Sequence, residues 1–244
     1  MTMLPVVVLA GGVGSRIASV DPTVPKPMLP VHGRPFLDWK LAGLVAQGVT
    51  EVLVLVSHRS DVIKNHLASE PVAGLSVTII DEGPEPLGTA GALRAAIDSL
   101  PDRFFVTYGD SYLTESFDAL GRLFDERRPE GAIAVVEFDT ELQPGNTALG
   151  GDVVVEYHKS KVPGRFPYLD YGQLALERNA LLRLPEGFRG DLAGLLEPLI
   201  ADRALLAVVV DALFFDLNTP EALESTAASF TDLGLPDLLD RYFS

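Results

Sequence analysis

The stretch that decides the fold is Val6-Val7-Val8-Leu9 followed by Ala10-Gly11-Gly12-Val13-Gly14-Ser15-Arg16. A short, apolar, β-branched run of this kind predicts a buried strand. Three glycines within the next few positions allow backbone N–H groups to converge on an anion without steric conflict. The stretch therefore predicts a strand that ends in a phosphate-binding loop.

Two cations follow the glycines, and a plain turn would explain neither. Arg16 is a forked, permanently charged donor, and Lys26 of Pro25-Lys26-Pro27 is a mobile point charge. Together they are suited to clamp a triphosphate and to offset charge on a leaving pyrophosphate. A P-loop would end in Gly-Lys-Ser/Thr, and the dinucleotide fingerprint would place a third glycine where Ile17 stands, so both classes are excluded.

Composition bounds the class of protein. With 244 residues and 47% hydrophobic content, the chain is long enough to bury a full core as one domain. Cysteine is absent, which excludes disulfides, thiolate metal sites and a cysteine nucleophile. Any metal must then be held by oxygen or imidazole ligands.

Charge and hydropathy limit the classes of binding partner and the cellular location that we expect. A net charge of −15, without a block of Lys and Arg, disfavours polymeric nucleic acid and anionic membranes. It does not exclude binding of a phosphorylated small molecule, because such binding depends on the cations near the site and not on the net charge. No signal-peptide pattern follows Met1, and no run of about 18 apolar residues occurs. We expect a soluble, cytoplasmic protein.

Apolar runs alternate with helical patterns, which predicts an α/β fold with a mostly parallel sheet flanked by helices. The expected strands of the first part are residues 6–9, 52–56, 75–80 and 104–107, and its helices are 37–47, 88–100 and 117–127. Later strands are expected at residues 132–138, 153–157, 173–176, 205–210 and 213–216. Thr219-Pro220 then predicts the N-cap and first residue of a C-terminal helix.

Several motifs carry a family resemblance. Leu9-Ala-Gly-Gly-x-Gly-x-Arg and Pro25-Lys-Pro-Met-Leu-Pro are followed, in order, by Glu85-Pro-Leu-Gly-Thr-Ala-Gly91, Tyr108-Gly-Asp-Ser111, Lys159 and Phe215-Asp-Leu-Asn-Thr-Pro220. This sequence resembles the sugar-1-phosphate nucleotidyltransferases over most of its length. The resemblance implies a Rossmann-like fold with a nucleotide-binding lobe at residues 1–130 and a smaller, mixed sugar-binding lobe at 131–244, within one domain.

The resemblance also implies a reaction, in which a sugar 1-phosphate attacks the α-phosphorus of an NTP to give an NDP-sugar and pyrophosphate. Glu85-Pro-Leu-Gly-Thr-Ala-Gly91 looks most like mannose-1-phosphate and heptose-1-phosphate guanylyltransferases, which favours GTP and a hexose or heptose acceptor. The implied catalytic residues are Arg16, Lys26 and Asp110. The implied nucleotide-binding residues are Leu9, Ala10, Gly11, Gly12, Gly14, Ser15, Arg16, Glu85, Leu87, Gly88, Thr89, Ala90 and Gly109.

Asp110 and Asp216 are the predicted magnesium ligands. Each follows or ends an expected strand, and ligands of open α/β sheets bind at carboxyl ends of strands. Mg²⁺ takes one or two carboxylates and completes its shell with waters and substrate phosphates. Members of the resembled family use their corresponding aspartates in this way.

The implied sugar-phosphate residues are Asn146, Lys159, Asp170 and Gly172. Lys159 matches the family lysine that pairs with the sugar-bound phosphate, although His158 replaces the usual preceding glutamate. Asp170-Tyr171-Gly172 occupies the place of the family's Asn-Ala-Gly turn, and an ionised Asp170 only accepts hydrogen bonds, which suits sugar hydroxyls. For Asn146, a sugar contact and a simple turn remain equally open.

Two other functions stay open. One is a cytidylyl- or uridylyltransferase for another phosphorylated acceptor, and the other is a non-catalytic nucleotide-sugar sensor or regulatory subunit. Self-association as a homo-oligomer is also open, because the apolar residues Leu233, Leu235, Leu238 and Leu239 suit either a partner or the core.

Overall fold

The computed structural model describes residues 3–12, 21, 23–137, 145–162 and 164–243. By internal contacts the chain forms two compact units. The N-terminal unit comprises Pro5–Pro86, Tyr108–Tyr112 and residues 214–243, and the central unit comprises Leu87–Thr107, Leu113–Leu213 and residues 3–4. Among the described residues, no helix combines the length and the apolar character that a membrane crossing requires.

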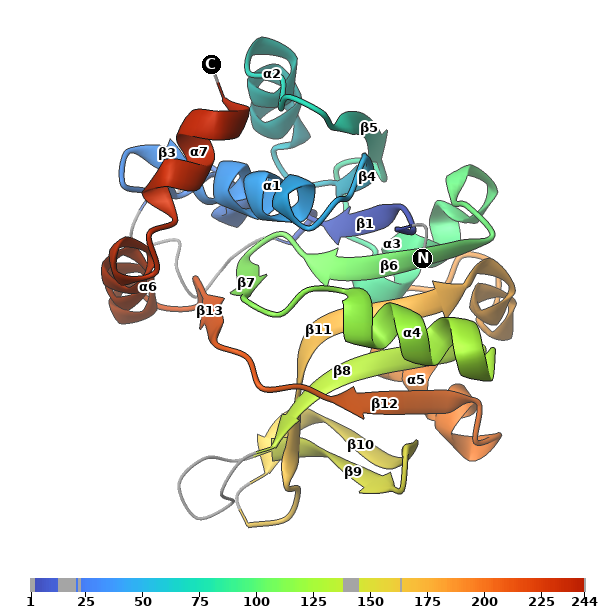
Figure 1. Cartoon of the computed structure of the whole chain (residues 1–244). Helices are drawn as coiled ribbons and strands as arrows, with labels where there is room; N and C mark the ends of the chain where they lie inside the picture. The colour runs from blue at the N-terminus through green and yellow to red at the C-terminus, as the bar shows by residue number, and fades with distance from the viewer. Residues whose placement is uncertain (1–2, 13–20, 22, 138–144, 163, 244) are drawn as a thin grey trace. The chain divides into compact units, whose positions relative to one another are not determined.

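The N-terminal unit is built on three parallel strands. These are β1 (Val6–Leu9), β4 (Glu51–Val56) and β5 (Ser76–Asp81), in the order β5-β4-β1. Val6 lies opposite Val52 in β4, and Val52 opposite Val77 in β5, so all three run the same way. Helices α1 (Phe36–Ala46) and α2 (Ser60–Ser69) make the crossovers that parallel strands require (Figure 1). The parallel strands predicted here are confirmed, whereas α2 was not predicted.

Further elements complete the unit: η1 (Lys26–Met28), β2 (Pro30–Val31), β3 (Arg34–Pro35), β7 (Ser111–Leu113), β13 (Phe214–Asp216), α6 (Pro220–Asp232) and α7 (Pro236–Tyr242). Strands β7 and β13 pair with each other. Helix α6 begins as predicted, because Thr219 Oγ1 accepts a hydrogen bond from Ala222 N at 3.1 Å. Within α7, Leu239 is buried, whereas Leu233 between the two helices is exposed.

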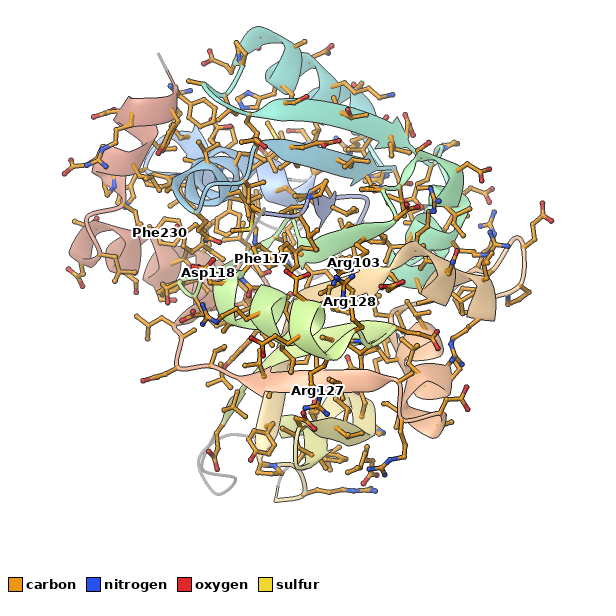
Figure 2. The ribbon with its side chains drawn as sticks, turned by 45° about the vertical axis from the view of Figure 1, so that its right-hand side comes forward. Arg103, Phe117, Asp118, Arg127, Arg128 and Phe230 are labelled. Carbon is orange, nitrogen blue, oxygen red and sulfur yellow. The ribbon has the colours of Figure 1, made fainter. Side chains whose placement is uncertain are left out.

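An aromatic cluster fixes α6 against the rest of the N-terminal unit. The ring of Phe230 on α6, labelled in Figure 2, is fully buried. Its centroid lies 5.2 Å from that of Trp39 and 6.0 Å from that of Phe36, both on α1. Tyr112 and Phe215 pack edge-on against it at 5.1 and 5.6 Å. The residues immediately before α6 are therefore attached to a rigid core.

The central unit carries a mixed sheet. Its strands are β6 (Arg103–Tyr108), β11 (Tyr168–Glu177), β8 (Gly131–Glu137), β12 (Leu205–Val209), β10 (Val153–Val162) and β9 (Gly145–Gly150), in that order. Strand β11 runs antiparallel to β6 and β8, and β12 runs parallel to β8. Strand β10 is antiparallel to β12 and β9. Strands β10 and β11 exceed their predicted lengths, and β9 was not predicted.

Helices cover this sheet. They are α3 (Thr89–Ala95), η2 (Ile97–Ser99), α4 (Asp118–Arg127), η3 (Arg178–Arg183) and α5 (Ala193–Ala201), and Figure 1 shows α4 next to β8. In Figure 2, Arg103 lies beside α4, where it stacks on Phe124 at 4.3 Å and pairs with Asp125 at 2.7 Å. One continuous helix over residues 88–100 is a wrong prediction. The helix breaks after Ala95 because Asp98 and Ser99 favour turns over helix interiors.

Candidate active site

The loop after β1 begins close to its neighbouring strand. Leu9 and Ala10 are buried, and Ala10 N donates to Leu55 O of β4 at 2.8 Å. A methyl group at Gly11 would lie 2.3 Å from Glu82 Oε1, so only glycine fits there without displacing that side chain. A Cβ at Gly12 would meet no atom of the described residues within 4 Å. The predicted residues Gly14, Ser15 and Arg16 lie outside the described residues.

Gly109 joins the turn after β6 to the end of β1. Its N–H donates to Leu9 O at 2.9 Å. A Cβ at this position would lie 3.2 Å from Ala10 Cβ, Leu9 O and Pro27 Cγ. The glycine is thus explained by close packing, and that packing places the following residue, Asp110, beside η1.

Lys26 and Asp110 form an ion pair at this place. Lys26 is 8% exposed, and its Nζ lies 2.5 Å from Asp110 Oδ2, whereas the Asp110 side chain is 34% exposed. Lys26 Nζ also donates to Asn218 Oδ1 at 2.8 Å. The sequence prediction did not assign a role to Asn218. Its position two residues after Asp216, just before a helix N-cap, was the signal available.

Asp216 belongs to the same cluster through the backbone. Leu217 N donates to Asp110 O at 3.2 Å, and Asp216 Oδ1 accepts from Asn218 N at 2.9 Å. Two half-exposed carboxylates on linked turns fit a magnesium ion, which binds hard oxygen ligands. The described residues contain no group of three or more His, Cys, Asp or Glu able to hold a metal. Mg²⁺ usually keeps several waters and binds substrate phosphates beside one or two carboxylates, so this pair of aspartates is sufficient for such a site.

A second lysine, Lys40 on helix α1, feels the charge of Asp110. The side chain of Lys40 is only 5% exposed, in a helix whose other inward residues are mainly apolar. Burial lowers the pKa of Lys40 to about 7, and the Asp110 carboxylate opposes that shift. Sequence reasoning missed this residue because a lysine in a helical pattern predicts a solvated face.

The predicted base-and-ribose segment lies in the central unit, apart from exposed Glu85. Gly88 has a φ of +81°, and a Cβ there would lie 2.4 Å from Gly190 O. Gly190 N donates to Leu87 O at 2.9 Å, and Ala90 N donates to Gly190 O at 3.1 Å. Thr89 Oγ1 accepts from Leu192 N at 2.9 Å. Residues 190–192 therefore hold this segment, a contact that no local pattern indicated.

The predicted sugar residues form a network elsewhere in the central unit. Asn146 is buried in β9, so it does not form a simple turn, and its Oδ1 accepts from Asp170 N at 2.9 Å. Gly172, with a φ of +79°, donates from its N to Asp170 Oδ1 at 2.7 Å. Burial raises the pKa of Asp170 to about 6, against hydrogen bonds from Gly172 and Tyr157. Burial and the charges of Asp170 and Asp191 raise the pKa of Tyr157.

Lys159 on β10 is placed very differently from Lys26. Its side chain is 71% exposed, and its Nζ pairs with a carboxylate oxygen of Asp191, which is 36% exposed. The other Asp191 oxygen accepts from Ala193 N at the start of α5. His158 makes local bonds instead: Ser160 N donates to its Nδ1 at 3.2 Å.

Comparisons with known proteins agree with this description. The sequence profile of the family described as "MobA-like NTP transferase domain" matches residues 6–216. D-glycero-alpha-D-manno-heptose 1-phosphate guanylyltransferase of Campylobacter jejuni is 35% identical over 106 residues, 43% of this chain and 47% of that protein. Mannose-1-phosphate guanylyltransferase catalytic subunit beta of Danio rerio is 32% identical over 149 residues, 59% of this chain and 41% of that protein.

A solved structure shares the fold over nearly the whole chain. The crystal structure of HddC from Yersinia pseudotuberculosis superposes with a TM-score of 0.78 and 26% identity, covering 93% of this chain and all of that one. The α/β nucleotidyltransferase fold expected from the sequence is confirmed. The chain spans less than half the length of the two curated relatives described above.

Proposed function

The chain belongs to the family of MobA-like NTP transferase domains, and from that premise we propose that it transfers a nucleotidyl group from an NTP to a sugar 1-phosphate. The observation that carries the proposal is the cluster of Lys26, Asp110 and Asn218 beside the loop that follows β1. It places a buried cation and a carboxylate next to the carboxyl end of β1, because Gly109, which precedes Asp110, donates to Leu9 O. Open α/β sheets bind ligands at the carboxyl ends of their strands.

The proposed reaction is an in-line displacement at the α-phosphorus. An oxygen of the acceptor phosphate forms the new P–O bond, and the bond from the α-phosphorus to the bridging oxygen breaks. The electron pair leaves with that oxygen as pyrophosphate. Positioning and charge neutralisation dominate such chemistry, so no protein nucleophile is required. Lys26 supplies positive charge for the phosphates, together with Arg16 in this proposal.

Magnesium is the proposed cofactor, with Asp110 and Asp216 as its protein ligands. When bound, it would neutralise phosphate charge and polarise the phosphorus that is attacked. The protein itself holds the two carboxylates on turns that are linked by the hydrogen bond from Leu217 N to Asp110 O. It also keeps the Lys26 ammonium beside the Asp110 carboxylate.

The acceptor residues of the proposal are those of the central unit. Lys159 would exchange its Asp191 partner for the acceptor's phosphate, because a phosphate dianion is a stronger partner than an exposed carboxylate. The ordered Asp170 carboxylate would accept hydrogen bonds from sugar hydroxyls, and Asn146 fixes the Asp170 backbone.

GTP is the proposed donor, and a heptose or mannose 1-phosphate the proposed acceptor. Both relatives named above are guanylyltransferases, one for a heptose 1-phosphate and one for mannose 1-phosphate. The chain's Glu85-Pro-Leu-Gly-Thr-Ala-Gly91 segment, which resembles such enzymes, points the same way.

The test is pyrophosphate release with Mg²⁺ across GTP, UTP, dTTP, CTP and ATP, each offered mannose, glucose and heptose 1-phosphates. We expect release that depends on both substrates, with GTP preferred. A CTP or UTP preference would support the alternative transferase and overturn the choice of base. Nucleotide binding without release from any pair would favour a sensor and contradict the proposed enzyme.

A further inference from the structure

Lys26 is an unusually constrained cation. Its side chain is almost fully buried, at 8% exposure, although it extends from a short 3₁₀ turn. Among the residues that the structure describes, its ammonium donates to Asp110 Oδ2 at 2.5 Å and to Asn218 Oδ1 at 2.8 Å. These acceptors lie 84 and 192 positions away along the chain. An ammonium has three N–H donors, so these two acceptors use two of them.

The two acceptors differ in charge, and the difference has a chemical consequence. The Asp110 carboxylate orients Lys26 but also offsets its positive charge. The Asn218 amide oxygen orients the ammonium while leaving its charge intact for phosphate. Asp110 is, in addition, a proposed metal ligand, so Asn218 is the acceptor that does not have to serve two cations.

Asn218 is itself held in place by its neighbours. Its backbone N donates to Asp216 Oδ1 at 2.9 Å. Leu217 before it is fully buried and bonds to Asp110 O, and Thr219 after it caps α6. Helix α6 is in turn anchored by Phe230. The Asn218 side chain thus comes from a rigid strand-to-helix junction, which is what a positioning group requires.

We propose that Asn218 is a positioning residue for nucleotidyl transfer, whose neutral amide oxygen aims the Lys26 ammonium at the phosphates without cancelling its charge. The inference rests on the proposed function for its consequence in catalysis. The aiming of Lys26 by Asn218 is independent of that function and can be measured without substrate.

The first test measures the reactivity of the Lys26 amine in the full chain. Brief acetylation with acetic anhydride, followed by peptide mass spectrometry, gives the modification rate of Lys26 relative to the exposed Lys159 in the same sample. We expect Asn218→Ala to raise that ratio by about tenfold, since a hydrogen bond to a charged group is lost. Asn218→Asp should keep Lys26 protected, because it retains the acceptor oxygen.

Thr219→Ala is the matched control. It removes the cap of α6 from the adjacent position and destabilises the same junction. Among the described residues, the side-chain acceptors of the Lys26 ammonium are Asp110 and Asn218, not Thr219. An equal rise in Lys26 reactivity in Thr219→Ala and Asn218→Ala would show that Asn218 acts only through the stability of the junction, and would overturn the proposal. So would unchanged reactivity in Asn218→Ala.

The second test measures turnover of the same variants. We expect kcat to fall about 100-fold in Asn218→Ala, with a smaller change in KM, because misplacing a group by an ångström has this order of effect. Asn218→Asp should also lose turnover although Lys26 stays protected, since a second carboxylate offsets the ammonium charge. Full turnover in Asn218→Asp would contradict the argument from charge. If the wild type releases no pyrophosphate, the proposed function fails, while the reactivity ratios still decide whether Asn218 aims Lys26.

Discussion

The two lysines proposed to bind phosphate, one in each unit, are held in opposite ways. Lys26 in the N-terminal unit is 8% exposed and donates to two oxygens. Lys159 in the central unit is 71% exposed and pairs with Asp191 alone among the described residues. Exposed ion pairs are weak and exchange readily, whereas a buried, doubly bonded ammonium is already oriented. Lys26 is thus suited to stabilise charge that develops during reaction, and Lys159 to capture an incoming phosphate.

The same contrast appears within the acceptor residues. Asp170 is fixed by Asn146 and Gly172, so the carboxylate proposed to contact the sugar is ordered before any substrate binds. Lys159 has no comparable support among the described residues. In the proposed function, the central unit would therefore combine a fixed sugar contact with an exposed phosphate contact. Because Lys26 is buried and Lys159 is exposed, we expect variants at the two lysines to alter different kinetic constants.

The largest effect is expected from Asp110→Asn. The amide keeps a hydrogen-bond acceptor for Lys26 but removes a carboxylate from the proposed metal site, so kcat should fall roughly 10²- to 10³-fold. The fold should persist, because the Asp110 side chain is 34% exposed and its loss creates no cavity. Steady-state kinetics measures the fall in kcat, and thermal unfolding of the same variant shows whether the fold persists. Near-normal kcat would remove Asp110 from its role.

The second-largest effects are expected from variants of the two lysines, which should change different kinetic constants. Lys159→Ala should raise KM for the sugar 1-phosphate about 10- to 100-fold, because one charged hydrogen bond is lost, and should change KM for the NTP little. Lys159→Arg should restore most of the affinity, since an exposed side chain has room for a guanidinium. Lys26→Arg should not preserve kcat, because its buried site is shaped for an ammonium. Similar losses for both substrates in Lys159→Ala would refute the assignment.

Lys40→Met is expected to have the smallest effect on catalysis, but it should clearly raise the free energy of unfolding. The folded pKa of Lys40 is lowered to about 7 from 10.5, so its burial penalises the folded state fully below pH 7, and the penalty fades as pH rises toward 10.5. Replacing such a buried charge by an apolar residue should stabilise the protein by about 1–4 kcal/mol at pH 6.

Urea unfolding at pH 6 and pH 9 tests this expectation, because the gain should be smaller at the higher pH. Leu41→Met, in the same buried helix, changes shape without changing charge, and its effect should not depend on pH. A gain for Lys40→Met that is equal at both pH values would show that Lys40 is not penalised by burial of its charge.

Local sequence patterns were sufficient to predict those parts of the structure that depend on residues close together in the sequence. The apolar run of β1 and the Thr219 cap of α6 follow from residues a few positions apart. The alternation of apolar runs with helical patterns predicted that the first strands would be parallel. The placement of Asp110 after β6 and of Asp216 at the end of β13 followed in the same way.

The rest of the candidate site depends on contacts that no local pattern records. Asn218 matters because it meets Lys26 across 192 positions, and Gly88 is required because Gly190 O approaches its Cα. Asp191 was missed as the partner of Lys159 for the same reason. Lys40 was missed because its burial contradicts the usual behaviour of lysine.

The most direct test of nucleotidyl transfer follows the fate of two labels. GTP labelled on the α-phosphate, and separately on the γ-phosphate, is incubated with the protein, Mg²⁺ and the acceptor found by the pyrophosphate assay, and the products are separated by ion-exchange chromatography. We predict that the α-label moves into the sugar nucleotide and the γ-label into pyrophosphate. A γ-label on the sugar, or in inorganic phosphate with the α-label in GDP, would show cleavage at a different bond and would contradict it.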